Sequence, residues 1–296
     1  MRKFILLAIL SLVLLAFVKL VLGNPHNNQE LVTSFWMKKS FASNKFNLIA
    51  CGDSRVYRGI SKDILDSFEQ DLQFLNLGYS SAGLSQDYLE FAVSKLDQNS
   101  ENKILLIGLS AHSLTKEAKK NEDWKGYMDK GRFDQFRFFY LSNVLKFFSP
   151  YKLSNVIKNK KKNYLQDYTN EGWVASNKVR ADSNDALKSY RSTFSKYQVE
   201  KEDIIELGAS IKKLKDSGVE VFIYRMPTTI AMKQFEDNHS GFIESEVKSI
   251  AVKNGAHWLS LPKKNFTTYD GSHLTKKSAI ELSKELSREI QLSLIK

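Results

Sequence analysis

Short apolar runs that alternate with helical patterns constrain the fold of this chain most strongly. The clearest run covers residues 103–108 and reads Lys-Ile-Leu-Leu-Ile-Gly. A strand that is buried on both faces gives such a continuous run, whereas a strand with one wet face alternates. Four further runs predict strands, at 46–51, 72–77, 219–224 and 256–259. The chain therefore predicts a parallel sheet of about five strands.

Segments with helical spacing of apolar residues separate these runs. They cover residues 60–68, 84–96, 201–216, 240–254 and 275–295. Glycine follows two of these segments as a typical helix stop, at Gly218 and Gly255. Strands that alternate with helices predict a doubly wound α/β fold, with helices on both faces of the sheet. Residues 46–296 are expected to form this one domain.

A long stretch after the third predicted strand breaks the alternation. We expect it to be a helical insertion at about 113–199, rich in aromatic residues and with a basic cluster at 158–162. Loops of this length in compact domains are usually functional or form small subdomains. The insertion either has a small core of its own or faces the membrane or a membrane partner, because interleaved aromatics and lysines suit a bilayer interface.

The N-terminus predicts a membrane anchor. Arg2 and Lys3 precede an apolar run at 4–22, and nineteen helical residues at about 1.5 Å each nearly span a hydrocarbon core of about 30 Å. Positive residues before the run favour a cytoplasmic N-terminus and an extracytoplasmic body. We therefore expect a single-pass anchor at 1–23 and a polar stalk at 24–45. The alternative is a cleaved signal peptide, which would leave a secreted or periplasmic protein.

Charge and cysteine content narrow the class of protein. The net charge of +11 points to an acidic partner, which is a membrane surface, an anionic polymer or nucleic acid. An exported body argues against nucleic acid. The single cysteine, Cys51, excludes an intramolecular disulfide and a cysteine-rich zinc site.

Two motifs supply the parts of a Ser-His-Asp hydrolytic site. Ser54 ends the sequence Gly-Asp-Ser after the first predicted strand, and Asp270 lies three residues before His273 after the fifth. The order of such a triad along a chain is not fixed, because geometry and roles define it. In an open α/β sheet the ligand crevice lies at the carboxyl ends of the strands, so these three side chains are expected to meet.

Other polar residues follow strand ends and are candidates for the same crevice. Arg55 and Arg225 are placed to grip a phosphate or carboxylate of a substrate, unless they are surface or partner-facing arginines. Ser110 and His112 follow the third strand. His112 is either an oxyanion donor or a polar residue at a strand end. The His/Asp pair has no clear third ligand, so no metal site is predicted.

On these motifs the chain resembles the SGNH (GDSL-type) hydrolase superfamily, whose fold is a flavodoxin-like three-layer α/β/α sandwich. The resemblance implies that Ser54 is the nucleophile, His273 the general base and Asp270 the acid that orients it. It also implies an oxyanion glycine after the second strand, in a stretch at 76–83. Gly78 or one of the following amides, such as that of Ser81, would donate to the oxyanion together with the N–H of Ser54.

One departure from the family pattern points to a subgroup. The third family block usually carries a G-x-N-D asparagine, but here residues 108–112 read Gly-Leu-Ser-Ala-His, so Ser110 or His112 would replace it. The layout is similar to membrane-anchored envelope-acylation proteins, which include DltD-like proteins and SGNH-like partners of MBOAT acyltransferases. That resemblance implies a cofactor-free O-acyltransferase or esterase that acts on a cell-envelope glycopolymer, with an MBOAT-type enzyme as a further partner. The alternative is a non-catalytic scaffold that binds polymer or recruits a membrane acyltransferase.

Overall fold

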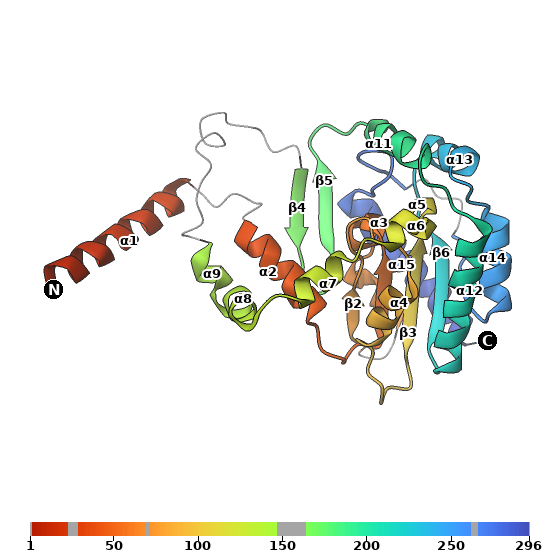
Figure 1. Cartoon of the computed structure of the whole chain (residues 1–296), viewed down its shortest axis with the longest axis horizontal. Coiled ribbons are helices and arrows are strands. Elements are labelled where there is room, and N and C mark those ends of the chain that lie inside the picture. The colour runs from red at the N-terminus through yellow and green to blue at the C-terminus, as the bar shows by residue number, and fades with distance from the viewer. Residues whose placement is uncertain (1, 23–28, 69–71, 147–163, 262–265, 296) are drawn as a thin grey trace.

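A five-stranded parallel sheet lies at the centre of the protein (Figure 1). The computed structural model describes residues 2–22, 29–68, 72–146, 164–261 and 266–295. The strands are β1 (Leu48–Gly52), β2 (Phe74–Asn76), β3 (Ile104–Leu109), β6 (Glu220–Arg225) and β7 (His257–Trp258). Their order across the sheet is β2-β1-β3-β6-β7, and every pairing is parallel. The predicted parallel sheet is therefore confirmed. After β1 the chain adds β2 on one side and then β3, β6 and β7 on the other, so the strand order switches between β1 and β3, as in doubly wound folds.

Helices cover both faces of the sheet and complete three layers. One face packs against α4 (Gln86–Val93), α12 (Lys201–Asp216) and α14 (Glu244–Lys253). The other packs against α3 (Ser54–Gly59), the short 3₁₀ helix η1 (Lys62–Leu65) and α15 (Lys276–Leu294). Along β1, Ile49 and Cys51 belong to the first core, whereas Leu48 and Ala50 belong to the second. Because side chains alternate between two dry faces, the strands had to be apolar throughout.

The insertion contains a β-hairpin as well as the expected helices. After α5 (Ala111–Leu114) and α6 (Lys116–Lys119), its helical elements are α7 (Asp123–Met128), α8 (Arg132–Phe136), the π-helical turn η2 (Arg137–Leu141), α9 (Ser142–Leu145) and α11 (Asp185–Phe194). Strands β4 (Tyr164–Tyr168) and β5 (Val174–Lys178) pair antiparallel. Gly172 turns between them with φ +83°, and a Cβ there would lie 2.2 Å from the carbonyl oxygen of Asn76. The hairpin turn thus packs directly on the edge strand, and the prediction of a purely helical insertion is corrected. The basic cluster at 158–162 lies outside the described residues.

Residues 29–40 of the segment predicted as a polar stalk form a packed helix. α2 (Gln29–Ser40) buries Met37 and Lys39. The Ser34 hydroxyl donates to the carbonyl of Phe138 in the insertion at 2.6 Å. The Lys39 ammonium donates to the carbonyls of Gly78 at 2.6 Å and Gly172 at 3.0 Å. α2 therefore connects the sandwich to the insertion, and the buried Ser34 and Lys39 are satisfied by backbone carbonyls rather than by water.

The first helix, α1 (Arg2–Leu22), presents exposed apolar side chains from Phe4 to Phe17. Within the described part of the chain, no helix meets both the length and the apolarity required to cross a membrane.

Candidate active site

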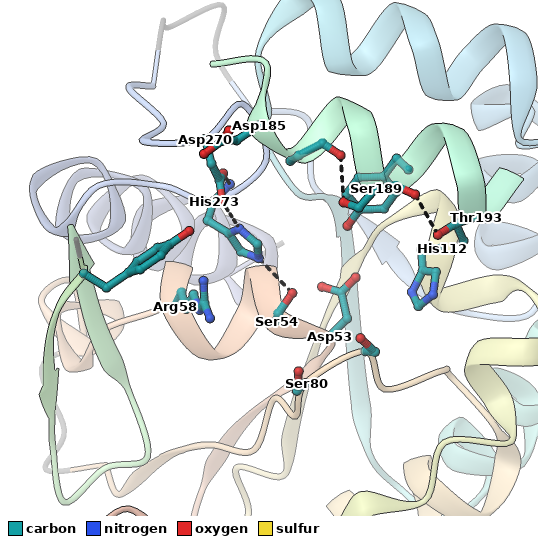
Figure 2. A pocket seen from close by; sticks show the side chains of 14 residues that line it. Asp53, Ser54, Arg58, Ser80, His112, Asp185, Ser189, Thr193, Asp270 and His273 are labelled. Carbon is teal, nitrogen blue, oxygen red and sulfur yellow. Dashed lines mark hydrogen bonds and ion pairs between the residues drawn. The ribbon is translucent and has the colours of Figure 1, made fainter. Parts of the chain in front are cut away.

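Three side chains from opposite ends of the chain form a hydrogen-bonded row (Figure 2). The Oγ atom of Ser54 lies 2.8 Å from Nε2 of His273. The Nδ1 atom of His273 lies 2.7 Å from Oδ2 of Asp270. The other carboxylate oxygen of Asp270 accepts the backbone N–H groups of Ser272 and His273 at 3.0 and 2.8 Å. The two sequence motifs therefore meet, in the arrangement of nucleophile, base and orienting acid.

The position of Ser54 follows from the end of β1. Gly52 has φ +146°, and a Cβ on it would lie 2.5 Å from Val56 and 2.6 Å from the carbonyl of Gly108. Only glycine fits this turn, which carries the chain from the strand directly into α3. Asp53 caps that helix, since its Oδ1 accepts the Arg55 N–H at 2.9 Å. Ser54 is thereby the first helical residue and faces the strand-end crevice.

The pKa shifts in this hydrogen-bonded row favour a charged Asp270 beside a neutral His273. Burial opposes the charge on Asp270, but the hydrogen bond from His273 and the two backbone N–H groups outweigh it and hold its pKa at about 2. Burial lowers the pKa of His273, and the positive charge of Arg58 lowers it further, although Asp270 works in the opposite direction. His273 is therefore neutral at neutral pH and can accept the proton of Ser54.

The row lies in a pocket of about 480 Å³, the catalytic pocket. Residues of the sandwich in its lining include Asp53, Ser54, Arg58, Ser80 and His112. The insertion adds Tyr164, Asp185, Ala186, Ser189, Tyr190 and Thr193. The sequence predicted either a small core or a membrane-facing surface for the insertion, and neither prediction included a contribution to the pocket lining. The insertion forms a wall of the pocket, because α11 and the hairpin lie over the strand ends.

Of the expected oxyanion donors, Ser54 and Ser81 reach the pocket and Gly78 does not. The N–H of Gly78 donates to Oδ1 of Asn76 at 3.0 Å, and Gly78 is absent from the pocket lining. Ser81 lines the pocket and has φ 53°, a left-handed conformation that non-glycine residues rarely adopt. Such strain often marks a functional turn. Of the two candidates after β2, Ser81 therefore lines the pocket and Gly78 does not.

Ser110 positions a neighbour instead of touching a substrate. Its hydroxyl donates to Oδ2 of Asp53 at 2.5 Å and also caps α5 by accepting the N–H of Ser113. It is fully buried and does not line the pocket. His112 does line it, and burial lowers the pKa of that imidazole, so it is neutral.

The two arginines expected to grip a substrate are committed elsewhere. Arg55 is buried, donating to Oγ of Ser272 at 2.8 Å and to Oε1 of Glu236 at 2.5 Å. Arg225 donates to Oε2 of the same Glu236 at 3.0 Å and forms ion pairs with Asp237 and Glu244. Neither arginine lines the pocket. Their predicted substrate role is corrected, since both stabilise α13 (Ile230–His239) against the sheet.

Arg58 is the cation that the sequence analysis missed. It lies one helical turn after Ser54 and lines the catalytic pocket. Its Nε donates to the hydroxyl of Tyr57 at 3.0 Å and its Nη1 to that of Tyr269 at 2.6 Å. The i, i+4 spacing of Ser54 and Arg58 on α3 was the available signal.

Across the part of the chain that the structure describes, no three His, Cys, Asp or Glu side chains are grouped to hold a metal ion.

Comparisons with known proteins add little to this geometry. No protein-family model matches the chain. No curated protein matches it either. A solved structure from Streptococcus pneumonia, provisionally described as a platelet activating factor, is 11% identical over 90% of this chain and 92% of its own. Its TM-score of 0.41 is too low for the likeness to support any argument.

Proposed function

We propose that the protein is a serine-dependent enzyme of the hydrolase type that forms an acyl-enzyme on Ser54. One observation carries the proposal: the hydrogen-bonded row from Ser54 through His273 to Asp270 opens into a pocket. A buried structural serine would not need a neutral histidine as a partner, or a carboxylate to orient that histidine.

The residues divide the reaction between them. Nε2 of His273 takes the proton of Ser54 while Oγ attacks an ester carbonyl, and the N–H groups of Ser54 and Ser81 receive the oxyanion. His273 then gives its proton to the leaving alcohol. A water molecule or a sugar hydroxyl attacks the acyl-enzyme, its proton passes to His273, and Ser54 is released with its own proton restored. Asp270 stabilises the charged imidazole in both steps.

The finer proposal is an O-acyltransferase or esterase of a cell-envelope glycopolymer. The resemblance to envelope-acylation proteins motivates it, and the net charge of +11 supports an anionic polymer or surface as the partner. In the same proposal the apolar N-terminal run anchors the chain with its body outside the cytoplasm, or is cleaved on export. An MBOAT-type enzyme would supply the acyl group.

An aromatic surface on the insertion supports contact with a membrane. Phe133, Phe136 and Tyr140 are 76%, 53% and 73% exposed along α8 and η2, and Val144 follows on α9. Aromatic rings of this kind are enriched at the headgroup level of bilayers. Cell fractionation with protease treatment of intact cells tests the location. A body that is protected from protease and stays in the cytosolic fraction would contradict it.

A second function, a non-catalytic scaffold, has one observation in its favour. The position of the missing asparagine is filled by Ser110, whose hydroxyl is bonded to Asp53 and cannot reach an oxyanion. The oxyanion would then have one hydrogen-bond donor fewer than in the family pattern. The reaction would be slow, would need a partner, or would not occur.

Labelling with a fluorophosphonate probe separates the two functions. The probe should modify Ser54, and Ser54→Ala should abolish the signal. Ser80→Ala is the matched control, because Ser80 is an exposed serine in the same pocket and, among the described residues, its hydroxyl has no hydrogen bond to a histidine. An unlabelled wild type, together with full in-cell function of Ser54→Ala, would establish the scaffold instead.

A further inference from the structure

A second cavity of about 260 Å³ adjoins the catalytic pocket and shares Arg58 and Ser80 with it. Five aromatic rings line this cavity, the aromatic pocket: Trp36, Tyr57, Tyr79, Tyr127 and Tyr168. They come from α2, α3, the loop after β2, α7 and β4. The sandwich, the helix before it and the insertion are all needed to build this pocket.

Several polar groups in the aromatic pocket are unused. Among the described residues, no hydrogen bond is made by the Trp36 indole N–H, the Tyr127 hydroxyl, the Asp123 carboxylate or the Ser80 hydroxyl. By contrast, the Tyr57 hydroxyl accepts from Arg58 and the Tyr168 hydroxyl donates to Gln166 at 3.4 Å. The pocket therefore offers ring faces and a set of free donors and acceptors at its edge.

We propose that the aromatic pocket binds one sugar ring of the substrate polymer, an inference that rests on the proposed function. A pyranose is a disc with C–H groups on its faces and hydroxyls around its edge. Its faces pack on aromatic rings, and its hydroxyls bond to polar groups like those of Trp36, Tyr127 and Asp123. Pockets for drug-sized ligands have volumes of about 300–1,000 Å³. The aromatic pocket is slightly smaller than this range, as expected for a site that holds a single sugar ring.

Other ligands fit this chemistry less well. A long acyl chain needs aliphatic walls, and Val174 is the one aliphatic residue in the lining that the structure describes. A quaternary ammonium group could pair with the Asp123 carboxylate, but it would also meet the positive charge of the Arg58 guanidinium in the same lining. The Lys39 nitrogen also lies over two of the rings, 4.9 Å from the Trp36 ring centroid and 5.2 Å from that of Tyr79, although burial lowers the pKa of this amine well below its ordinary value.

The shared residues place the bound ring beside the nucleophile. Ser80 and Arg58 line both cavities, so in this proposal one edge of the ring borders the catalytic pocket that holds Ser54. In transfer, that hydroxyl oxygen attacks the acyl carbon. A new ester bond to the sugar forms, the ester bond to Ser54 breaks, and the hydroxyl proton passes through His273 to Oγ of Ser54. In deacylation of the polymer the same pocket holds the sugar that carries the ester.

Direct binding of neutral trisaccharides tests the assignment. Chitotriose, cellotriose and maltotriose are titrated into the Ser54→Ala protein, where no acyl transfer can occur, and binding is measured by saturation-transfer NMR and calorimetry. At least one should bind saturably. Adding Trp36→Leu or Tyr127→Leu should weaken it about tenfold or more, as expected for a central aromatic contact. Tyr127→Phe keeps the ring and should retain most of the affinity.

Tyr140→Leu is the matched control, because Tyr140 is an exposed aromatic residue on η2 outside the pocket. It should bind sugar as the parent protein does. Binding of none of the three sugars, or equal binding by the Trp36→Leu protein with its fold intact by circular dichroism, would overturn the proposal. So would preferential binding of choline or octanoate.

Failure of this inference and failure of the proposed function give different results. Labelled Ser54 without sugar binding overturns the sugar site and leaves the enzyme. Unlabelled Ser54 with sugar binding that depends on Trp36 overturns the enzyme and supports a polymer-binding scaffold with this site.

Discussion

The Arg58 guanidinium donates a 2.6 Å hydrogen bond to the hydroxyl of Tyr269, the residue before Asp270. The Tyr269 ring in turn stacks on the His273 imidazole, with centroids 5.8 Å apart and an interplanar angle of 14°. One cation thus joins the helix of the nucleophile to the loop of the base and acid. Its charge also lies close enough to affect the titration of His273.

Replacing Arg58 should shift the pH profile of the reaction. Burial and the Arg58 charge both lower the pKa of His273, so Arg58→Gln should raise it. Since the base works only when neutral, the acidic limb of the rate of Ser54 labelling should move to higher pH. Arg58→Lys keeps the charge and should keep the limb near its original position. Superimposable profiles for Arg58→Gln and wild type would contradict this role.

Asp270→Asn should slow acylation of Ser54 strongly with little change in fold. The amide cannot accept from Nδ1 of His273 as the carboxylate does, and the imidazolium loses its partner. In a well-studied serine protease the equivalent change costs about 10⁴ in rate. Pre-steady-state acylation by p-nitrophenyl acetate measures it. A loss below about tenfold would place Asp270 outside the mechanism.

The same carboxylate should make stability depend on pH in acid. Its pKa is about 2 in the folded protein against about 3.9 in an unfolded chain. The folded state therefore gains stability above pH 3.9, by about 2–3 kcal/mol, and loses it as the pH falls from there toward 2. Urea unfolding between pH 5 and pH 2.5 should show this loss for wild type. The Asp270→Asn protein lacks this group and should show a correspondingly shallower decline.

Ser81 should tolerate glycine and resist a β-branched residue. At φ 53° a glycine adopts the same backbone without the steric cost of a Cβ, and its N–H remains available. Ser81→Gly should therefore label at Ser54 at least as fast as wild type. Ser81→Val should label more slowly, because branching at Cβ disfavours this conformation and displaces the N–H. Equal rates for glycine and valine would remove Ser81 from the oxyanion site.

Glu236→Gln should destabilise the protein. Glu236 is fully buried between Arg55 and Arg225, and breaking a buried ion pair from one side typically costs about 3–5 kcal/mol. Urea unfolding at pH 7 measures the loss. Asp237→Asn is the matched control. Its carboxylate also pairs with Arg225 but is 38% exposed, so the loss should be below about 1 kcal/mol. Similar losses for the two variants would contradict the buried network.

The sheet and the triad could be predicted because each rests on a local pattern with one geometric outcome. Strands with two dry faces must be continuously apolar, as β3 is, and parallel strands place their carboxyl ends at one edge. Ser54 and His273 each follow such an end, so their meeting required no knowledge of the loops between them. The left-handed backbone at Ser81 could not be predicted from the sequence, because a positive φ is usually indicated by glycine or asparagine and not by serine.

The roles of several buried polar residues could not be predicted, because they depend on partners that only the folded structure brings together. Arg55 read as a free cation because its acceptor, Glu236, lies 181 residues away on α13. Arg225 is only 11 residues from Glu236, but their ion pair depends on how α13 packs beside β6. The residues of α2 read as an irregular polar segment because the acceptors of Lys39 lie in two other loops. Burial of a polar residue becomes visible only when its partner is known.

The distance along the chain between the two halves of the site sets when the protein becomes reactive. Ser54 and His273 are 219 residues apart, and α15 follows His273 immediately. A growing polypeptide therefore carries an unactivated serine until His273, made 219 residues later, has folded against it. In the proposed mechanism it cannot acylate itself or consume esters before the loop of His273, which leads into α15, has docked. Closing so long a loop costs conformational entropy, which confines the chemistry to molecules in which both segments have already folded together.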